Sequence, residues 1–111
     1  MQERNRGDYQ IASRETIAEG QDLRVRALAL QPGQSVPWHY HSHITDSFVG
    51  LDGITVVETR DPEGRVELAP GNQTAVAPGR AHKVTCGSDA GCRFLVIQGV
   101  GVYDFVALDE N

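Results

Sequence analysis

Turn-forming residues divide this 111-residue chain into short segments in which apolar and polar residues alternate. Proline is followed closely by glycine in the stretches 31–34, 61–65, 70–72 and 78–82. Proline presets the φ torsion of a turn, and glycine adopts the positive φ values that other residues avoid. Between the turns lie about eight to ten strand-like segments and no long helical pattern. This spacing predicts an all-β sandwich or barrel.

The clearest strand signal is the sequence LRVRALAL at residues 23–30. Side chains alternate between the two faces of a strand, so Leu23 and Val25 share one face. Arg24 and Arg26 share the other.

Two further segments predict how the chain turns. The strand-like run that ends at Asp52–Gly53 finishes on a dipeptide favoured in hairpin turns. The apolar stretch 93–108 predicts one or two strands, with a break near Gly99 or Gly101.

The N-terminal residues 1–20 are expected to form an arm, frayed or docked at an edge over residues 1–10. Ser13 and Gly20 suit the start and the end of a helix, but the segment between them is too short to predict one.

Composition excludes several classes of protein. The formal net charge is -5 and the ten basic residues are dispersed, so no basic surface for nucleic acid is expected. No apolar stretch is long enough to span a membrane, and the N-terminus has no apolar segment of the kind found in secretory signals. These features predict a cytoplasmic protein.

The chain has two cysteines, Cys86 and Cys92, on either side of a turn-like stretch. They could face each other across a hairpin and form a disulfide. Reduced thiols are the expected state in the cytoplasm, and the spacing does not match a metal or redox motif.

Histidine is concentrated in two places. His39, His41 and His43 alternate along a predicted strand, Asp46 follows, and His82 lies in the turn segment 78–82. Alternate residues of a strand share a face, so the first three imidazoles can point the same way. Imidazole and carboxylate are common ligands of divalent transition metals.

These residues resemble the first motif of the cupin superfamily, G-x5-H-x-H-x4-E-x6-G, over residues 33–53. The matching positions are Gly33, His39, His41, Asp46 and Gly53. Every spacing agrees, and the one departure is aspartate in place of the usual glutamate.

The second cupin motif, G-x5-P-x-G-x2-H-x3-N, is matched over residues 71–86 through Gly71, Gly79 and His82. Its usual proline falls on Ala77 and its usual asparagine falls on Cys86.

The resemblance implies one cupin domain over residues 1–111, folded as a double-stranded β-helix (a jelly-roll β-barrel) and often a homodimer. The residues expected to converge on one divalent metal are His39, His41, Asp46 and His82. Fe, Mn, Ni, Zn and Cu all suit three imidazoles and one carboxylate.

The role of Asp46 has three alternatives, because its side chain is one methylene shorter than glutamate. It could ligate the metal directly, accept a hydrogen bond from a ligand histidine, or have no role in the site. His43 is a substitute ligand if alternation continues, whereas Cys86 fits a small core residue better than a ligand.

Aromatic residues divide between two faces in the same way. Trp38 and Tyr40 alternate against the histidines and are expected to pack elsewhere or at a dimer interface. The residues that could wall a cavity are Phe48, Phe94, Tyr103 and Phe105.

The leading functional hypothesis is a metal-dependent enzyme that acts on a small organic molecule. Dioxygenase chemistry is preferred over isomerase or decarboxylase chemistry. No separate base or nucleophile stands out, and Glu58, Glu67 and Asp104 are candidates only as carboxylates. The alternatives are a non-catalytic module that binds a small ligand and a dimer with a vestigial site.

Overall fold

The computed structural model describes residues 9–87 and 89–110, and every regular element in these ranges is a strand. The ten strands are β1 (Ser13–Glu19), β2 (Leu23–Leu30), β3 (Ser35–Tyr40), β4 (Thr45–Gly53), β5 (Thr55–Thr59), β6 (Gly64–Leu68), β7 (Gln73–Val76), β8 (His82–Cys86), β9 (Cys92–Gly99) and β10 (Val106–Ala107). The all-β prediction is confirmed. Residues 1–8 of the predicted arm lie outside the described residues.

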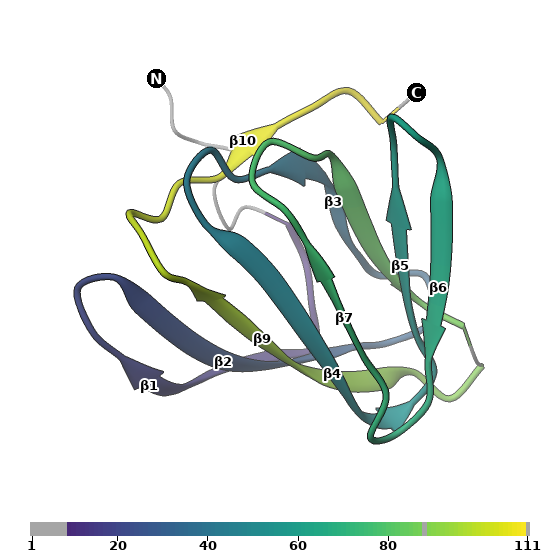
Figure 1. Cartoon of the computed structure of the whole chain (residues 1–111). Helices are drawn as coiled ribbons and strands as arrows, with labels where there is room; N and C mark the ends of the chain where they lie inside the picture. The colour runs from purple at the N-terminus through teal and green to yellow at the C-terminus, as the bar shows by residue number, and fades with distance from the viewer. Residues whose placement is uncertain (1–8, 88, 111) are drawn as a thin grey trace.

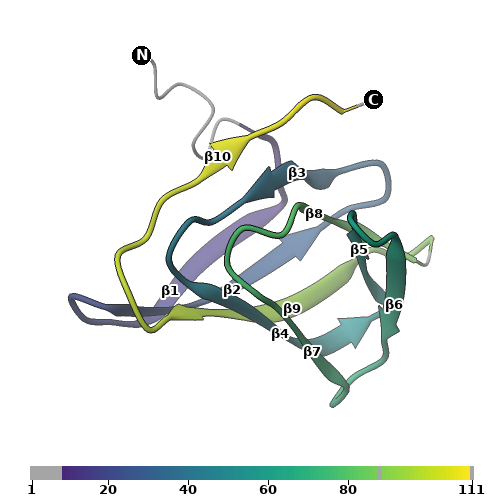
Figure 2. The same ribbon diagram turned by 45° about the horizontal axis from the view of Figure 1, so that its top comes forward.

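The strands form two five-stranded antiparallel sheets (Figure 1). The first sheet has the order β1-β2-β9-β4-β7 and the second has the order β10-β3-β8-β5-β6. Figure 2 shows β10 beside β3 at the edge of the second sheet. Within the described part of the chain, no helix could cross a membrane.

Alternate residues of both sheets point into the space between them and make one core. In β9, Cys92, Phe94 and Val96 are buried, while the residues between them are more exposed. They pack with apolar residues from β2, β3, β4, β5 and β8, among them Leu28 and Val84. This period-two burial is what the sequence pattern predicts for a half-covered sheet.

The inner face of β2 carries the two arginines. Leu28 and Leu30 are buried, and Arg24 and Arg26 lie in phase with them. Leu23, on the opposite phase, is 40% exposed. The inward face of β2 is therefore apolar near its end and carries two guanidinium groups near its start.

The strand β1 corrects the sequence-based prediction that residues 1–20 form an arm. Ser13–Glu19 pairs with β2 as an edge strand, and all of its residues are exposed. A segment of this length cannot nucleate a stable helix, whereas pairing with β2 supplies its backbone hydrogen bonds at once. The structure holds one chain, so the homodimer stays a prediction.

The strand that was predicted to end in a turn at Asp52–Gly53 does end there, but the turn does not make a hairpin. β4 lies in the first sheet and β5 in the second, so the two strands do not pair. The turn instead carries the chain from one sheet to the other.

Gly53 is required at this crossing by both torsion and space. Its φ is 67°, and a Cβ placed on it would lie 2.2 Å from the carbonyl oxygen of Gly91. Gly79 also has a positive φ, 82°, but a Cβ there would meet nothing within 4 Å. A side chain at Gly79 would therefore meet only torsional strain, whereas a side chain at Gly53 would meet torsional strain and a steric conflict.

We predict that Gly79→Ala lowers the free energy of unfolding by about 1–2 kcal/mol, the cost of a left-handed conformation for a residue with a Cβ. Gly53→Ala should cost clearly more, because a backbone oxygen must also move. Urea unfolding of the two variants beside the wild type measures both. Equal losses would show that the contact with Gly91 gives way freely.

The two cysteine thiols face each other, but not across a hairpin, because β8 lies in the second sheet and β9 lies in the first. The Sγ atoms of Cys86 and Cys92 are 3.2 Å apart, and both cysteines are free. Cys86 packs beside the core and also contacts the carbonyl oxygen of Leu30. Burial and the neighbouring Cys92 thiol raise the pKa of Cys86 to about 12. The reactive thiolate is therefore scarce near neutral pH.

We predict that the pair stays reduced in air at pH 7 and forms an intramolecular disulfide when a strong oxidant is added at higher pH. Intact-protein mass spectrometry would show the loss of two hydrogens, and Cys86→Ser is the control that cannot close the bond. Only intermolecular disulfides after oxidation would contradict this geometry.

Candidate metal centre

Four buried side chains meet near one end of the space between the sheets. They are His39 near the end of β3, His41 just after it, Asp46 near the start of β4, and His82 at the start of β8. Their ligand atoms all lie within 4.8 Å of one another. Each of the four residues is at most 2% exposed. The structure therefore brings together the four residues that the sequence singled out.

Main-chain pairing positions the histidines. His39 of β3 stands opposite His82 of β8 in the second sheet. His41 has left the strand, and its carbonyl oxygen accepts a hydrogen bond from the N–H of Gly79 at 2.7 Å. This bond joins the loop that carries His41 to the turn that precedes His82.

Backbone carbonyls fix the direction of all three imidazoles. The Nδ1–H of His39 donates to Pro37 at 2.6 Å, and that of His82 donates to Arg80 at 2.9 Å. The Nδ1–H of His41 donates to the carbonyl of Asp104. A carbonyl only accepts hydrogen bonds, so Nδ1 carries the proton and Nε2 is the ligand atom in each ring.

The carboxylate of Asp46 lies at the centre of the cluster. Its Oδ2 is 3.0 Å from Nε2 of His41, 2.8 Å from Nε2 of His82 and 4.0 Å from Nε2 of His39. Its Oδ1 accepts a hydrogen bond of 3.0 Å from the side-chain amide of Gln98. Gln98 therefore holds one oxygen and leaves the other for the imidazoles.

The ionisation of the cluster follows from burial and these contacts. Burial alone would raise the pKa of Asp46, but the hydrogen bonds and charge of His41 and His82 hold it well below its usual range. Burial likewise opposes charge on His41, yet the contact with Asp46 raises its pKa. Burial and the two neighbouring histidines lower the pKa of His39 to about 3. His39 is therefore neutral at physiological pH and offers a free lone pair.

The donor set fits a divalent transition metal. With Nδ1 protonated, the Nε2 lone pairs of His41 and His82 face an anionic oxygen, an arrangement that needs a proton or a cation between the atoms. Metal–ligand bonds of about 2.1 Å place neighbouring donors about 3.0 Å apart and opposite donors about 4.2 Å apart. The separations around Asp46 match these values. The cluster could therefore hold one ion with small shifts of its side chains.

Aspartate reaches the cluster despite its shorter side chain. Asp46 pairs with Gln98 of β9 and Val76 of β7, between two strands, and is 2% exposed. Its Oδ2 is itself one of the converging ligand atoms. This geometry places Asp46 within the cluster, where its oxygen contacts His41 and His82 and could also ligate a metal.

The substitute ligands do not take part in this cluster. His43 is exposed and lies in a bend after β3, where the alternation that placed it beside His41 no longer applies. Cys86 contacts Cys92 at the far end of β8. Trp38, from the opposite face of β3, stacks under the guanidinium of Arg60 and so packs within the chain.

Aromatic rings support the imidazoles. His39 stacks on Phe105 with ring centroids 4.3 Å apart, and Phe48 lies edge-on to His82 at 5.9 Å. The ring centroids of Tyr103 and His41 are 5.3 Å apart. Together with Phe94, these residues line a cavity beside the cluster, as predicted.

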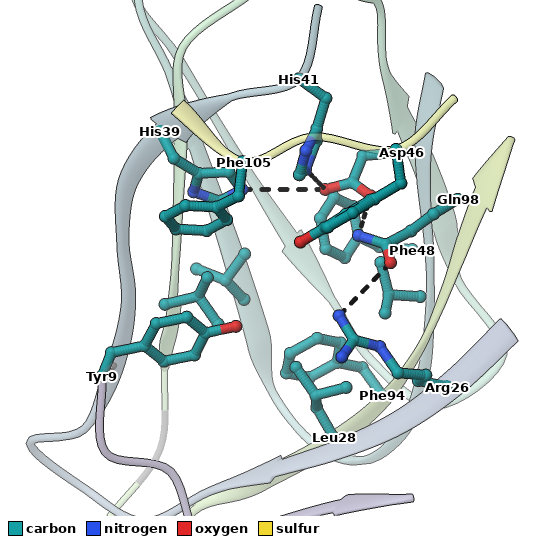
Figure 3. Close-up of a pocket in the computed structure, with 14 residues that line it drawn as sticks. Tyr9, Arg26, Leu28, His39, His41, Asp46, Phe48, Phe94, Gln98 and Phe105 are labelled. Carbon is teal, nitrogen blue, oxygen red and sulfur yellow. Dashed lines mark hydrogen bonds and ion pairs between the residues drawn. The ribbon is translucent and has the colours of Figure 1, made fainter. Parts of the chain in front are cut away.

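The cavity extends from Asp46 toward β2 and opens to solvent (Figure 3). Its empty space is about 300 Å³ including the mouth, and only a small part of this admits a water molecule. A ligand beside the cluster can therefore have only a few non-hydrogen atoms unless side chains move.

Three polar residues of this cavity were not predicted from the sequence. Gln98 occupies an inward position of the otherwise apolar face of β9, and Arg26 shares the inward face of β2 with Arg24 and two buried leucines. Alternation along the two strands could have revealed both residues. Tyr9 also lines the cavity but lies outside the motifs and the strands, so no pattern indicates it.

Comparison with known proteins bears on the fold and the family of the chain. The search of curated proteins gave no match. Among solved structures, a protein with a double-stranded β-helix domain from Klebsiella pneumoniae is 21% identical, with a TM-score of 0.74 over 87% of this chain and 84% of that one. A cupin-2 domain containing protein from Shewanella frigidimarina is 22% identical, with a TM-score of 0.66 over 81% and 82%.

An oxalate oxidase in complex with glycolate is 14% identical, with a TM-score of 0.70 over 78% of this chain and 46% of that one. This likeness shows the fold alone. The family model described as "Cupin domain" matches residues 27–98, which hold all four clustered residues. With its two antiparallel sheets and double-stranded β-helix neighbours, the chain belongs to the cupin family.

Proposed function

We propose that this protein is a metal-dependent enzyme acting on a small organic molecule, with dioxygenase-like chemistry. His39, His41, Asp46 and His82 would hold one divalent transition metal. The observation that carries the proposal is the convergence of three oriented imidazole nitrogens and one carboxylate oxygen beside a solvent-open cavity.

Charge supports a catalytic rather than a purely structural ion. Three neutral imidazoles and one carboxylate leave a divalent ion with a net positive charge, and four protein ligands leave coordination positions for small molecules. When bound, the metal supplies Lewis acidity and, if it is Fe or Mn, one-electron chemistry with oxygen. The chain itself orients the imidazoles through Pro37, Asp104 and Arg80 and limits water with aromatic walls.

The residues around the cavity favour oxidation over proton-transfer chemistry. Apart from the four clustered residues, the titratable groups that line it within the described chain are Tyr9, Arg26 and Tyr103. Burial raises the pKa of Tyr103, so its phenol stays protonated at neutral pH. An isomerase needs a base near the substrate. Glu58 and Glu67 do not line this cavity, and Asp104 contributes a carbonyl to His41.

A second function, non-catalytic binding of a small ligand, is favoured by the narrowness of the same cavity. A binding module needs a recognition pocket but neither a proton relay nor a redox-active metal. The two functions differ in turnover, which the second experiment below measures.

We predict that protein purified without an affinity tag carries close to one equivalent of Fe, Mn, Ni, Zn or Cu. His41→Ala should lose most of this metal, because it removes one ligand nitrogen and leaves the buried carboxylate of Asp46 without one of its partners. His43→Ala is the matched control, since His43 is exposed nearby and contributes no clustered ligand atom. Elemental analysis at known protein concentration measures all three. Equal metal content in the two variants would sink the site assignment.

We further predict that Fe(II)-loaded protein consumes dioxygen when supplied with a suitable small organic acid, whereas Zn(II)-loaded protein does not. An oxygen electrode with product analysis measures the difference. Zinc is redox-inert, so equal turnover by both forms would point to isomerase or lyase chemistry. No turnover by any loaded form would favour the binding module.

A further inference from the structure

The side chain of Arg26 is desolvated on the inside of the fold without a matching anion. Its Nε is buried and has no hydrogen-bond partner within residues 9–87 and 89–110. Its one side-chain hydrogen bond in these ranges runs from Nη2 to Oε1 of Gln98, at 3.3 Å. A guanidinium has five N–H donors, and a buried donor without a partner is costly because it has lost its hydrogen bonds to water.

A second guanidinium competes for the same acceptor. Nε and Nη2 of Arg24 donate to Oε1 of Gln98 at 3.3 Å and 3.2 Å. Arg24 also lies over the ring of Tyr103, 4.0 Å from its centroid. One amide oxygen therefore serves two positive charges.

The groups that act most strongly on the charge of Arg26 are Arg24 and Arg14, which oppose it, and the phenols of Tyr103 and Tyr9. Neither Arg24 nor Arg26 forms a salt bridge in the described part of the chain. Among the described residues, the inner end of β2 therefore carries two guanidinium groups that no ion pair neutralises.

This charge lies beside the candidate metal centre. Arg24, Gln98 and Asp46 stand in one row across the first sheet, and Arg26 stands in the adjacent row opposite Val96. Gln98 bridges the two sites, because its N–H donates to Asp46 and its oxygen accepts from Arg26. Figure 3 shows Arg26, Gln98 and Asp46 linked in this order along the cavity, with the hydroxyl of Tyr9 directed inward from the other side.

We propose that Arg26 binds the carboxylate of a small anionic substrate, with Arg24 reinforcing the positive potential. The substrate's reactive end would then lie toward the clustered histidines, a placement that rests on the proposed function. Recognition of the carboxylate by Arg26 requires no metal.

Geometry favours a carboxylate over a bulkier anion. A planar guanidinium matches the two oxygens of a planar carboxylate with parallel hydrogen bonds. The cavity beside Arg26 is narrow and has apolar walls that include Leu28 and Phe94. A short chain of carbon atoms ending in a carboxylate satisfies both the charge and the walls, whereas inorganic phosphate satisfies only the charge.

Propionate and its neutral, nearly isosteric amide, propionamide, are the probes that test this proposal. We predict that propionate binds both metal-free and Zn(II)-loaded protein at least ten times more tightly than propionamide, measured by ligand-observed NMR titration. Arg26→Gln should weaken propionate binding about 10–100-fold, the value of one hydrogen bond to a charged group. Arg65→Gln is the control, because Arg65 is exposed on β6 and pairs with Glu67.

Arg26→Lys keeps the charge and loses the planar fork, so it should retain part of the affinity. Thermal unfolding checks that both variants fold, and if neither does, the comparison of the two probes on wild-type protein decides the matter. Equal binding of propionate and propionamide would overturn the proposal, as would binding that Arg26→Gln leaves unchanged. Preference for inorganic phosphate, or no propionate binding at millimolar concentration, would also overturn it.

The outcomes separate this inference from the proposed function. Arg26-dependent binding of propionate to a protein that takes up no metal would support the carboxylate site and remove the metal enzyme. Metal-dependent turnover that Arg26→Gln does not alter would support the metal enzyme and remove the carboxylate site.

Discussion

The buried carboxylate of Asp46 is the contact on which the rest of this structure depends. It is 2% exposed, and one of its oxygens lies within 4.0 Å of three imidazole nitrogens. A carboxylate in such a position is stable only if hydrogen bonds and positive charge replace the lost water. His41, His82 and Gln98 contact the carboxylate through hydrogen bonds. A divalent cation would add the positive charge. The organisation of the surrounding strands follows from this need.

The first sheet supplies a polar row and the second sheet supplies the imidazoles. Asp46, Gln98 and Arg24 stand side by side on β4, β9 and β2, while His39 and His82 pair across β3 and β8. Deeper in the same space, Phe94 and Val84 are fully buried. The fold therefore places a polar end and an apolar core within one pair of sheets, and residues of both line the cavity.

Sequence patterns predicted the parts of this arrangement that depend on local rules. Alternation and turn residues predicted the strands, because they depend on the fixed period of a strand. The resemblance to the two cupin motifs predicted the four clustered residues. The pairing of the strands was harder to predict. Asp52–Gly53 suits a hairpin turn locally, but here the chain crosses from one sheet to the other at this point. Gln98 and Arg26 were missed because their importance arises only when β9 and β2 are brought beside Asp46. The prediction that His43 could substitute as a ligand depended on continued alternation, and the chain leaves the strand before this residue.

The central claim is that the three imidazoles and Asp46 coordinate one metal ion directly. X-ray absorption spectroscopy of metal-loaded protein in solution tests this most directly, because imidazole rings give a distinct multiple-scattering pattern. We predict about three imidazole nitrogens and at least one oxygen at about 2.0–2.2 Å, with the imidazole contribution reduced in His41→Ala. A first shell of oxygen alone, with no imidazole scattering, would contradict the account.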